Sequence, residues 1–350
     1  MQTLILSIII FGIIIFVHEF GHYSVAKITG VKVEEFALGM GPKLIGKQWG
    51  ETYYSFRVFP LGGFCHMAGE NTGESLEQKN TSQVDISKRF DKKPLHVRFA
   101  VIAAGSIMNL LLAVLIFSSV FAIIGIPSQL SNEIGSVLPG TPAESAGLLP
   151  GDKIIRINGT VIEDWSGVTG YIHNNPGEEL TIELERAEDK MVFKITPEFN
   201  SDTQTGMIGI TSTNSNMVKV GVLNSIRFGT LKTVEIIQLT FQSIGQMITG
   251  KVSAEGISGP VGIIKIIGET ANYGLLYVAN LTALISINIG LLNLFPIPAL
   301  DGSRLLFLFA ELIRGKPVPA AKENMIHFLG FVFLMSIMLF VTYKDIIKLF

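Results

Sequence analysis

The chain has 350 residues, of which 48% are hydrophobic and only 16% are charged, and its mean hydropathy is +0.46. This composition excludes an ordinary soluble enzyme and indicates a protein embedded in a lipid bilayer. The net charge of −2 argues against nucleic acid as a partner. The single cysteine, Cys65, excludes an internal disulfide framework.

Most of the hydropathy comes from apolar stretches at residues 4–17, 99–126, 275–295 and 326–343. The second and third are long enough to cross a hydrocarbon core of about 30 Å as helices, whereas the fourth is marginal. The sequence therefore predicts four transmembrane helices, which we place at residues 1–27, 98–127, 275–302 and 325–350.

The first apolar stretch is shorter than the roughly 20 residues that a membrane span needs. A helix from Met1 reaches that length only by running through the segment HEFGH to about Ala26. The alternative is a cleaved signal peptide, but no basic residue precedes the apolar run and no small-residue cleavage site follows it. We therefore expect HEFGH to lie inside the first membrane helix.

Basic residues predict the orientation of the chain. One group lies just before the second span, at Lys88, Arg89, Lys92, Lys93 and Arg98. Another follows the third span, at Arg304, Arg314, Lys316 and Lys322. By the positive-inside rule, the first and third connections are cytoplasmic and the second is external. Both termini then lie outside, although Lys344 and Lys348 on the outer tail run against the rule.

The first connection, residues 28–97, divides into two parts. Up to about Met67 it alternates apolar and polar residues and carries glycine turns, which predicts short strands and hairpins lying against the membrane. Residues 68–93 are polar and predict a mobile cytoplasmic loop. A second cytoplasmic loop is expected at residues 303–324.

The second connection has the composition of a small external domain at residues 128–215. It contains a predicted short helix at 143–146 and a strand at 153–157, and the segments LTIELERA and MVFKITP alternate as further strands. Residues 216–274 follow it. There the spacing between 220 and 250 predicts an amphipathic helix at the outer interface, and GISGPVGI (256–263) predicts a glycine-proline break.

The segment HEFGH predicts a metal site. His18 and His22 are four residues apart, so on a helix both imidazoles project from one face, about 6 Å apart along the axis. This spacing lets two nitrogens bind one zinc ion, and Glu19 is placed to act as general base. The alternative is a chance match. However, an ionisable Glu costs about 2.5–3.5 kcal/mol or more at the bilayer centre and is rarely present there without a function.

A catalytic zinc site of this type needs a third protein ligand and an open position. Spans one and three run in the same direction, so we searched the inner end of span three, which reads NLFPIPALDG (293–302). Pro296 and Pro298 disrupt helical hydrogen bonding, which is tolerated at membrane depth only beside protein or a polar cavity. Asp301 follows and is the expected third ligand. The alternative is an ordinary turn residue before Gly302.

These motifs match a known family. HEFGH in the first span, together with N-x-x-P-x-P-x-x-D-G in a later span, resembles the site-2 protease family of intramembrane zinc metalloproteases. The PDZ-like segment between spans two and three is similar to the bacterial branch typified by the regulator of sigma-E protease. The resemblance covers nearly the whole chain. It implies a polytopic α-helical membrane protein with a membrane-reentrant β-hairpin region and an inserted α+β PDZ-like domain.

The resemblance also implies roles for individual residues. His18, His22 and Asp301 would bind one Zn²⁺ per chain, with Glu19 as the catalytic base. The residues that match the family motif and its reentrant β-hairpin would bind the substrate, namely Asn293, Gly39, Met40, Gly41, Pro42 and Asn109. In the hairpin, an edge strand pairs with the backbone of the unwound substrate.

The chain departs from the family at several positions. Gly105-Ser106 stands where the family usually has Gly-Pro, which leaves the role of the retained Asn109 open. His66 lies on a loop after a Gly-Gly turn, where we expect ordinary packing rather than a metal ligand. The other histidines outside HEFGH, which are His96, His173 and His327, are not expected to belong to the site. One PDZ-like domain is present, whereas well-known relatives carry two.

The resulting hypothesis is regulated intramembrane proteolysis in a bacterial inner membrane. The expected substrates are single-span membrane proteins, such as anti-sigma factors or remnant signal peptides, probed for size by the PDZ-like domain and shortened beforehand by another protease. One alternative is a non-catalytic scaffold that binds peptides through its PDZ-like domain. Another is a transporter, which predicts an inverted repeat that the sequence does not show.

Overall fold

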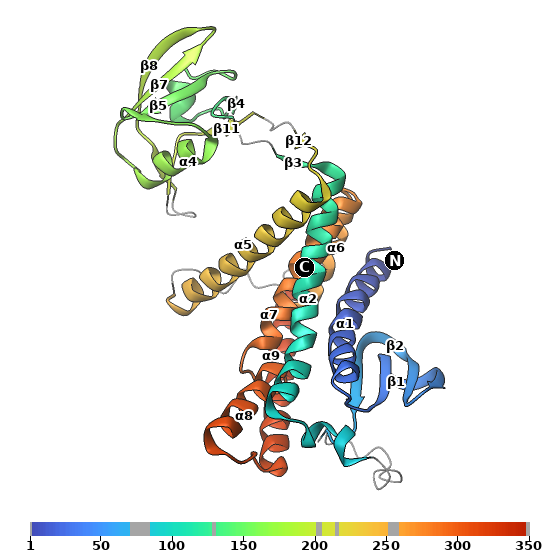
Figure 1. The fold of residues 1–350 in the computed structure, drawn as a ribbon. Helices are drawn as coiled ribbons and strands as arrows, with labels where there is room; N and C mark the ends of the chain where they lie inside the picture. The colour runs from blue at the N-terminus through green and yellow to red at the C-terminus, as the bar shows by residue number, and fades with distance from the viewer. Residues whose placement is uncertain are drawn as a thin grey trace. The chain divides into compact units, whose positions relative to one another are not determined.

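The computed structural model describes residues 2–70, 85–127, 131–200, 205–213, 217–250 and 259–347. The chain forms two compact units (Figure 1). One unit combines Met1–Val120 with Val222–Phe350, and the other is Phe121–Gly221.

The first unit is built on long apolar helices. Among the described residues, four helices are long and apolar enough to cross a membrane: α1 (Gln2–Ile28), α2 (Leu95–Ile124), α7 (Leu275–Leu294) and α9 (Ala320–Ile347). They lie where the sequence predicts membrane spans. Helix α1 runs without a break through HEFGH, as the length of its apolar run requires.

Helices α1 and α7 are joined through a shared apolar core. Ile10 and Ile14 of α1 pack with Val278 and Ile285 of α7 and with Ile267 of α6 (Pro260–Ala271). Helix α6 begins inside the predicted glycine-proline break because Pro260 occupies its first turn, where a missing N–H costs nothing. The preceding residues 251–258, which include the start of GISGPVGI, lie outside the described part of the chain.

A carboxylate from α9, the last candidate membrane span, caps the start of α6. Asp345 of α9 is buried and accepts hydrogen bonds from the backbone N–H groups of Gly259 (3.2 Å) and Gly262 (2.8 Å). These N–H groups have no partner within the helix, so Asp345 acts as an N-cap supplied from another element. The contact fixes α6, and with it the α1–α7 core, to α9.

The β region differs from the predicted set of short strands. It consists of two long antiparallel strands, β1 (Val33–Trp49) and β2 (Thr52–Met67), that fold back on themselves. Residues 35–38 of β1 lie opposite both 53–56 and 63–66 of β2. Glycines at positive φ, including Gly39 (88°) and Gly62 (94°), allow the strands to bend. The membrane-reentrant placement of this region stays a prediction.

The β region packs against the end of α1 that carries HEFGH. Val33 and Phe36 of β1 and Met67 of β2 share a buried cluster with Ala26 of α1 and Val101 of α2. The polar segment that follows contains two 3₁₀ turns, η2 (Ile86–Lys88) and η3 (Phe90–Lys92), where a loop was predicted. Residues 71–84 of that predicted loop lie outside the described residues.

The third span and the loop after it differ from the prediction. The helix α7 ends at Leu294, not near 302, because the prolines that follow it cannot continue the hydrogen-bond ladder. Helix α8 (Asp301–Arg314) then occupies most of the predicted loop and ends at Gly315 in the left-handed conformation (φ 67°). The apolar residues of SRLLFLFAELIR recur at helical spacing, a pattern that the preceding prolines obscured.

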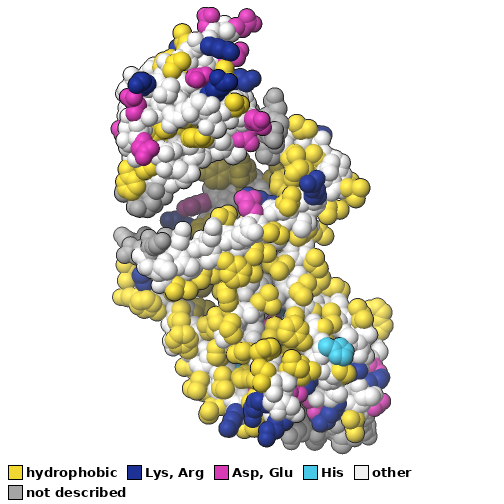
Figure 2. Space-filling view, turned by 60° about the vertical axis from the view of Figure 1, so that its left-hand side comes forward, with side chains coloured by type: hydrophobic (Ala, Val, Ile, Leu, Met, Phe, Trp, Pro, Cys, Tyr) yellow, Lys and Arg dark blue, Asp and Glu magenta, His cyan; other side chains and the backbone are white. Residues whose placement is uncertain are grey.

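Helix α5 (Val222–Ile248) belongs to the first unit and lies where the sequence predicts an amphipathic helix. It approaches α2 closely at Gly229, where an added Cβ would lie 2.3 Å from Ser118 Oγ. Figure 2 shows hydrophobic side chains over much of the visible face of the helical unit, with Lys and Arg side chains gathered toward one end. This distribution is typical of a surface that faces lipid.

The second unit is an α+β domain with its own core. Its sheet has the strand order β6-β5-β7-β8, formed by β5 (Lys153–Ile157), β6 (Thr160–Val161), β7 (Leu180–Arg186) and β8 (Asp189–Ile195). The helix α4 (Trp165–Asn174), which the sequence analysis missed, covers this core with Trp165 and Val168. The remaining elements are short, namely β3 (Ile126–Pro127), β4 (Ile134–Val137), α3 (Pro142–Ser145), β9 (Glu198–Asn200), β10 (Thr205–Met207), β11 (Ile210–Ser212) and β12 (Met217–Val218).

We predict that Asp345→Ala lowers the free energy of unfolding by about 1–3 kcal/mol, because it leaves buried N–H groups of the α6 N-terminus unpaired. Thermal unfolding of the detergent-solubilised protein measures the effect. The matched control is Glu269→Ala, which removes an exposed α6 carboxylate whose partner Lys265 lies 3.9 Å away. Equal midpoints for the two variants would contradict the capping role.

Candidate metal centre

The two histidines of HEFGH point the same way from α1. Both are nearly buried, with exposed fractions of 7% for His18 and 8% for His22. Their ring centroids are 4.8 Å apart and their Nε2 atoms 3.2 Å apart. The helical spacing thus places two ring nitrogens at one point, as two ligands of a single metal ion require.

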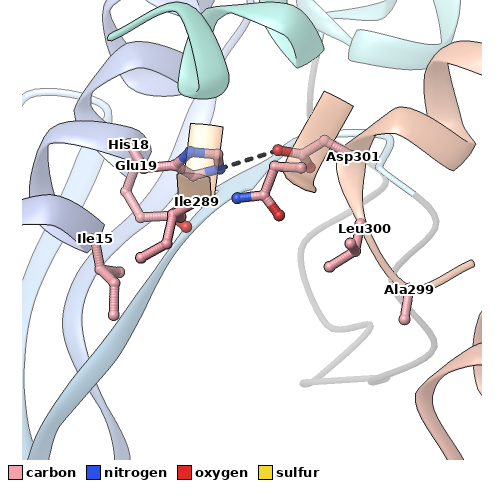
Figure 3. Close-up of a pocket in the computed structure, with 8 residues that line it drawn as sticks. Ile15, His18, Glu19, Ile289, Ala299, Leu300 and Asp301 are labelled. Carbon is pink, nitrogen blue, oxygen red and sulfur yellow. Dashed lines mark hydrogen bonds and ion pairs between the residues drawn. The ribbon is translucent and has the colours of Figure 1, made fainter. Parts of the chain in front are cut away.

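Asp301, which lies far from the two histidines in the sequence, contacts these nitrogens. Its Oδ2 atom lies 3.0 Å from His18 Nε2 (Figure 3). The same atom lies 3.2 Å from His22 Nε2. Within the part of the chain that the structure describes, these three side chains are the one group of His, Cys, Asp and Glu residues whose ligand atoms converge, all within 4.8 Å. The structure therefore brings the three predicted ligands together.

The hydrogen bond behind His22 shows that the donor set fits a cation. His22 Nδ1 lies 2.8 Å from the carbonyl oxygen of Val101 on α2. A carbonyl only accepts, so Nδ1 carries a proton, and Nε2 is the nitrogen of this ring that can bind a cation. Nε2 faces the Asp301 carboxylate oxygen 3.2 Å away, so a nitrogen and an oxygen donor are directed at the same point. Two imidazoles and one carboxylate are typical protein ligands of catalytic zinc.

Gly105 of α2 makes room for the two imidazoles. A Cβ atom at this position would lie 2.3 Å from His22 Nε2 and 2.8 Å from His18 Cε1. Any side chain would therefore enter the space of the ligand nitrogens. The sequence drew attention to Gly105 only through the serine that follows it, because a close approach between helices leaves no local signal.

The turn before Asp301 is held by α9. Ala299 has a φ of 76°, which is unusual for a residue with a side chain, and its N–H donates to His327 Nδ1 at 3.2 Å. Gly330 lets Pro298 pack against α9, since a Cβ there would lie 2.2 Å from Pro298 Cβ. Sequence reasoning set His327 aside. Its distance along the chain from NLFPIPALDG gave no signal for this contact.

Two ion pairs hold α8, the helix that begins with Asp301. Arg304 pairs with Glu70 at the end of the β region, and Arg98 of α2 pairs with Glu311 (Nη1–Oε2 3.0 Å). Burial alone would lower the pKa of Arg304, but the Glu70 carboxylate raises it above its ordinary value. The guanidinium therefore stays charged, and the metal ligand is tied to both neighbouring elements.

A pocket of about 240 Å³ opens beside two of the three proposed ligands, His18 and Asp301. It is lined by Ile15, His18, Glu19, Ile289, Asn293, Ala299, Leu300 and Asp301 (Figure 3). Glu19 and Asn293 thus reach the same space as the ligands, although they come from α1 and α7. The pocket combines apolar walls with polar groups that converge on one space, as a binding site requires.

The other predicted substrate contacts lie elsewhere. Asn109 is fully buried behind His18, and residues 39–42 are not among those that line the pocket. Gly39 and Gly41 pack against Phe59, whereas Gly63 of β2 approaches the site, since a Cβ there would lie 3.3 Å from Glu19 Cγ. His66 pairs with Glu34 at 3.4 Å, away from the ligands. A substrate-binding role for Gly39, Met40, Gly41, Pro42 and Asn109 stays a prediction.

The site and the helices that carry it define a class of protein. An H-E-x-x-H helix with a distant carboxylate, a free glutamate and an adjoining pocket is the arrangement of a zinc metallopeptidase, placed here on candidate membrane spans. Residues 6–337 match the model of Peptidase family M50. The chain belongs to this family.

Relatives support the same class. The chain is 35% identical over 346 residues to a putative zinc metalloprotease of Clostridium acetobutylicum, covering 99% of this chain and 97% of the relative. It is 34% identical over 424 residues to the zinc metalloprotease RasP of Bacillus licheniformis, covering all of both chains. It is 33% identical over 420 residues to the regulator of sigma-W protease RasP of Bacillus subtilis, covering 100% of this chain and 99% of the relative.

One solved structure resembles a small part of the chain. The PDZ domain of the SdrC-like protein from Listeria monocytogenes matches 24% of this chain and 90% of that domain, at 24% identity and a TM-score of 0.22. This score assigns no fold, and the PDZ-like character of the second unit stays a prediction. The family and its relatives establish an integral membrane zinc metalloprotease, as the sequence predicted.

We predict that Gly105→Ala lowers the cleavage rate by roughly 100-fold or more, because the added methyl group displaces the ligand nitrogens by about 1 Å. Zinc content and cleavage are both measured on the purified protein. Gly245→Ala on α5 is the control, since a Cβ there meets nothing within 4 Å. Full zinc content and activity in Gly105→Ala would show that the approach of α2 does not constrain the site.

Proposed function

We propose that this protein hydrolyses peptide bonds within the transmembrane segments of single-span membrane proteins. The observation that supports this most directly is the placement of the site. His18, His22 and Glu19 lie within the candidate span α1, and the pocket beside them is walled by Ile15 and Ile289 of two such spans. A peptide bond can reach this pocket only within the bilayer, which favours a transmembrane segment as the substrate.

The ligands proposed for one Zn²⁺ per chain are His18, His22 and Asp301. When bound there, the ion would polarise the scissile carbonyl and lower the pKa of a water molecule that serves as nucleophile. Glu19 lines the same pocket and takes the role of general base, accepting a proton from water and delivering it to the leaving amine. Glu19 is available for this task because it is not one of the three converging side chains proposed as ligands.

The substrate has to unwind before it is cut, because the carbonyl groups of a helix are engaged in hydrogen bonds. The Asn293 side chain lines the pocket and offers both a donor and an acceptor to an unwound backbone. The β region offers strand addition at its edge, with residues 39–42 as the proposed contact segment and Met40 exposed at 54%. This pairing would replace the hydrogen bonds that the substrate loses.

We place the protein in a bacterial inner membrane, with both termini and the second unit external. A relative is named regulator of sigma-W protease, which supports anti-sigma factors as one substrate class beside remnant signal peptides. The second unit would act as a PDZ-like size filter that admits substrates shortened by an earlier protease. The basic residues clustered before α2 support this orientation.

The test is cleavage of a reconstituted model transmembrane segment by three variants. Glu19→Gln is expected to keep its zinc and to lose cleavage by at least about 100-fold, the usual contribution of a general base. His22→Ala is expected to lose both zinc and cleavage. Glu269→Gln, which changes an exposed carboxylate on α6, is the control and is expected to match the wild type.

Two results would contradict the proposal. One is a Glu19→Gln variant that cleaves at the wild-type rate. The other is a zinc-loaded wild type that cleaves no model transmembrane segment while its external unit still binds peptides, as expected of a scaffold.

A further inference from the structure

Asn109 of α2 lies in direct contact with a proposed metal ligand. Its side chain is fully buried, with an exposed fraction of 0%, and its Nδ2 atom is 3.4 Å from His18 Nδ1. The Oδ1 atom of the same amide is buried and has no hydrogen-bond partner among the residues that the structure describes. A buried amide oxygen without a partner is uncommon and calls for an explanation.

The amide can serve His18 in either tautomer. If Nε2 carries the ring proton, it donates to Asp301 Oδ2 at 3.0 Å, and Nδ1 accepts from the Asn109 amide. If Nε2 binds a cation, the proton moves to Nδ1, which then requires an acceptor. A half-turn of the amide places Oδ1 in the position of Nδ2 and supplies that acceptor, and the two orientations have the same shape.

Helix α2 contacts the Nδ1 atom of both histidines. His22 Nδ1 lies against the Val101 carbonyl, and His18 Nδ1 lies against the Asn109 amide. Gly105, whose absent side chain leaves space for both rings, sits midway between them on the same face of the helix. One face of α2 therefore contacts the Nδ1 atoms of both histidines, the ring nitrogens that point away from Asp301.

Asn109 is itself held in place by α7. Its backbone oxygen accepts a hydrogen bond from Ser286 Oγ at 2.8 Å. Gly290 allows the close approach, since a Cβ there would lie 3.2 Å from Asn109 Cβ. The amide is thus fixed between α1, which carries the histidines, and α7, which leads to Asp301.

We infer that Asn109 is a positioning residue, whose Oδ1 accepts the His18 Nδ1–H and holds Nε2 in the orientation and tautomer that bind the metal. This role differs from the predicted contact with substrate, since Asn109 is fully buried and is not among the residues that line the pocket. The inference rests on the proposed metal site, but it concerns zinc affinity and not cleavage.

The test is the zinc affinity of the full-length protein in detergent, measured by competition with a chelator. Asn109→Leu keeps the side-chain size and removes the acceptor, so we expect affinity to fall about 10–100-fold. Asn109→Asp keeps an acceptor oxygen and removes the donor, so we expect affinity at or above that of the wild type. The control is Asn288→Leu, which removes another amide of the helical bundle, one that accepts from Thr240 at 3.3 Å.

Distinct outcomes separate the possible roles. Wild-type zinc affinity in Asn109→Leu, together with slower cleavage, would overturn the inference in favour of a substrate contact. An equal loss of affinity in Asn109→Leu, Asn109→Asp and Asn288→Leu would show that general packing is responsible. Because zinc affinity is measured without substrate, the inference can hold even if the wild type proves unable to cleave transmembrane segments.

Discussion

The structure of the helical unit depends on the meeting of His18, His22 and Asp301 within about 3 Å of one another. In a bilayer, polar groups must find their partners inside the protein, because lipid offers none. The neighbouring helices therefore have to supply both space and hydrogen bonds. Helix α2 does so by combining an empty position at Gly105 with partners for the outer ring nitrogens at Val101 and Asn109.

The proposed third ligand, Asp301, requires an interrupted helix, and an interrupted helix at this depth requires support. Prolines end α7, and the turn that follows is held by contacts from α9 at His327 and Gly330. The helix α8 then begins at Asp301 and is tied by ion pairs to the β region and to α2. The carboxylate is consequently fixed by elements far apart in the sequence, so that it faces the histidines without relying on its own short turn. This arrangement is the kind of preorganisation that catalysis in a water-poor site needs.

Sequence reasoning reached the ligands because their signals are local. The spacing of His18 and His22 follows from helix geometry, and the short apolar run before them places them inside a membrane helix. Asp301 was found by matching the depth of two parallel spans. By contrast, α8 was predicted as a loop because prolines precede it. Helices α4 and α6 were missed because each is too short to show a clear helical repeat of apolar residues. The folding of β1 and β2 onto one another depends on pairings between distant residues that no local pattern encodes.

The sequence by itself determined the class of protein, the candidate spans and the three side chains that converge, which we propose as metal ligands. Each of these depends on residue type and on spacing along one element or between two parallel ones. Only the tertiary structure decided which groups stand behind the ligands: Gly105, Asn109 and His327 become part of the site through contacts between helices. The physical reason is that a glycine or a buried amide contributes to a site only through the residue that it contacts. That neighbour is brought close by packing and not by proximity in the chain.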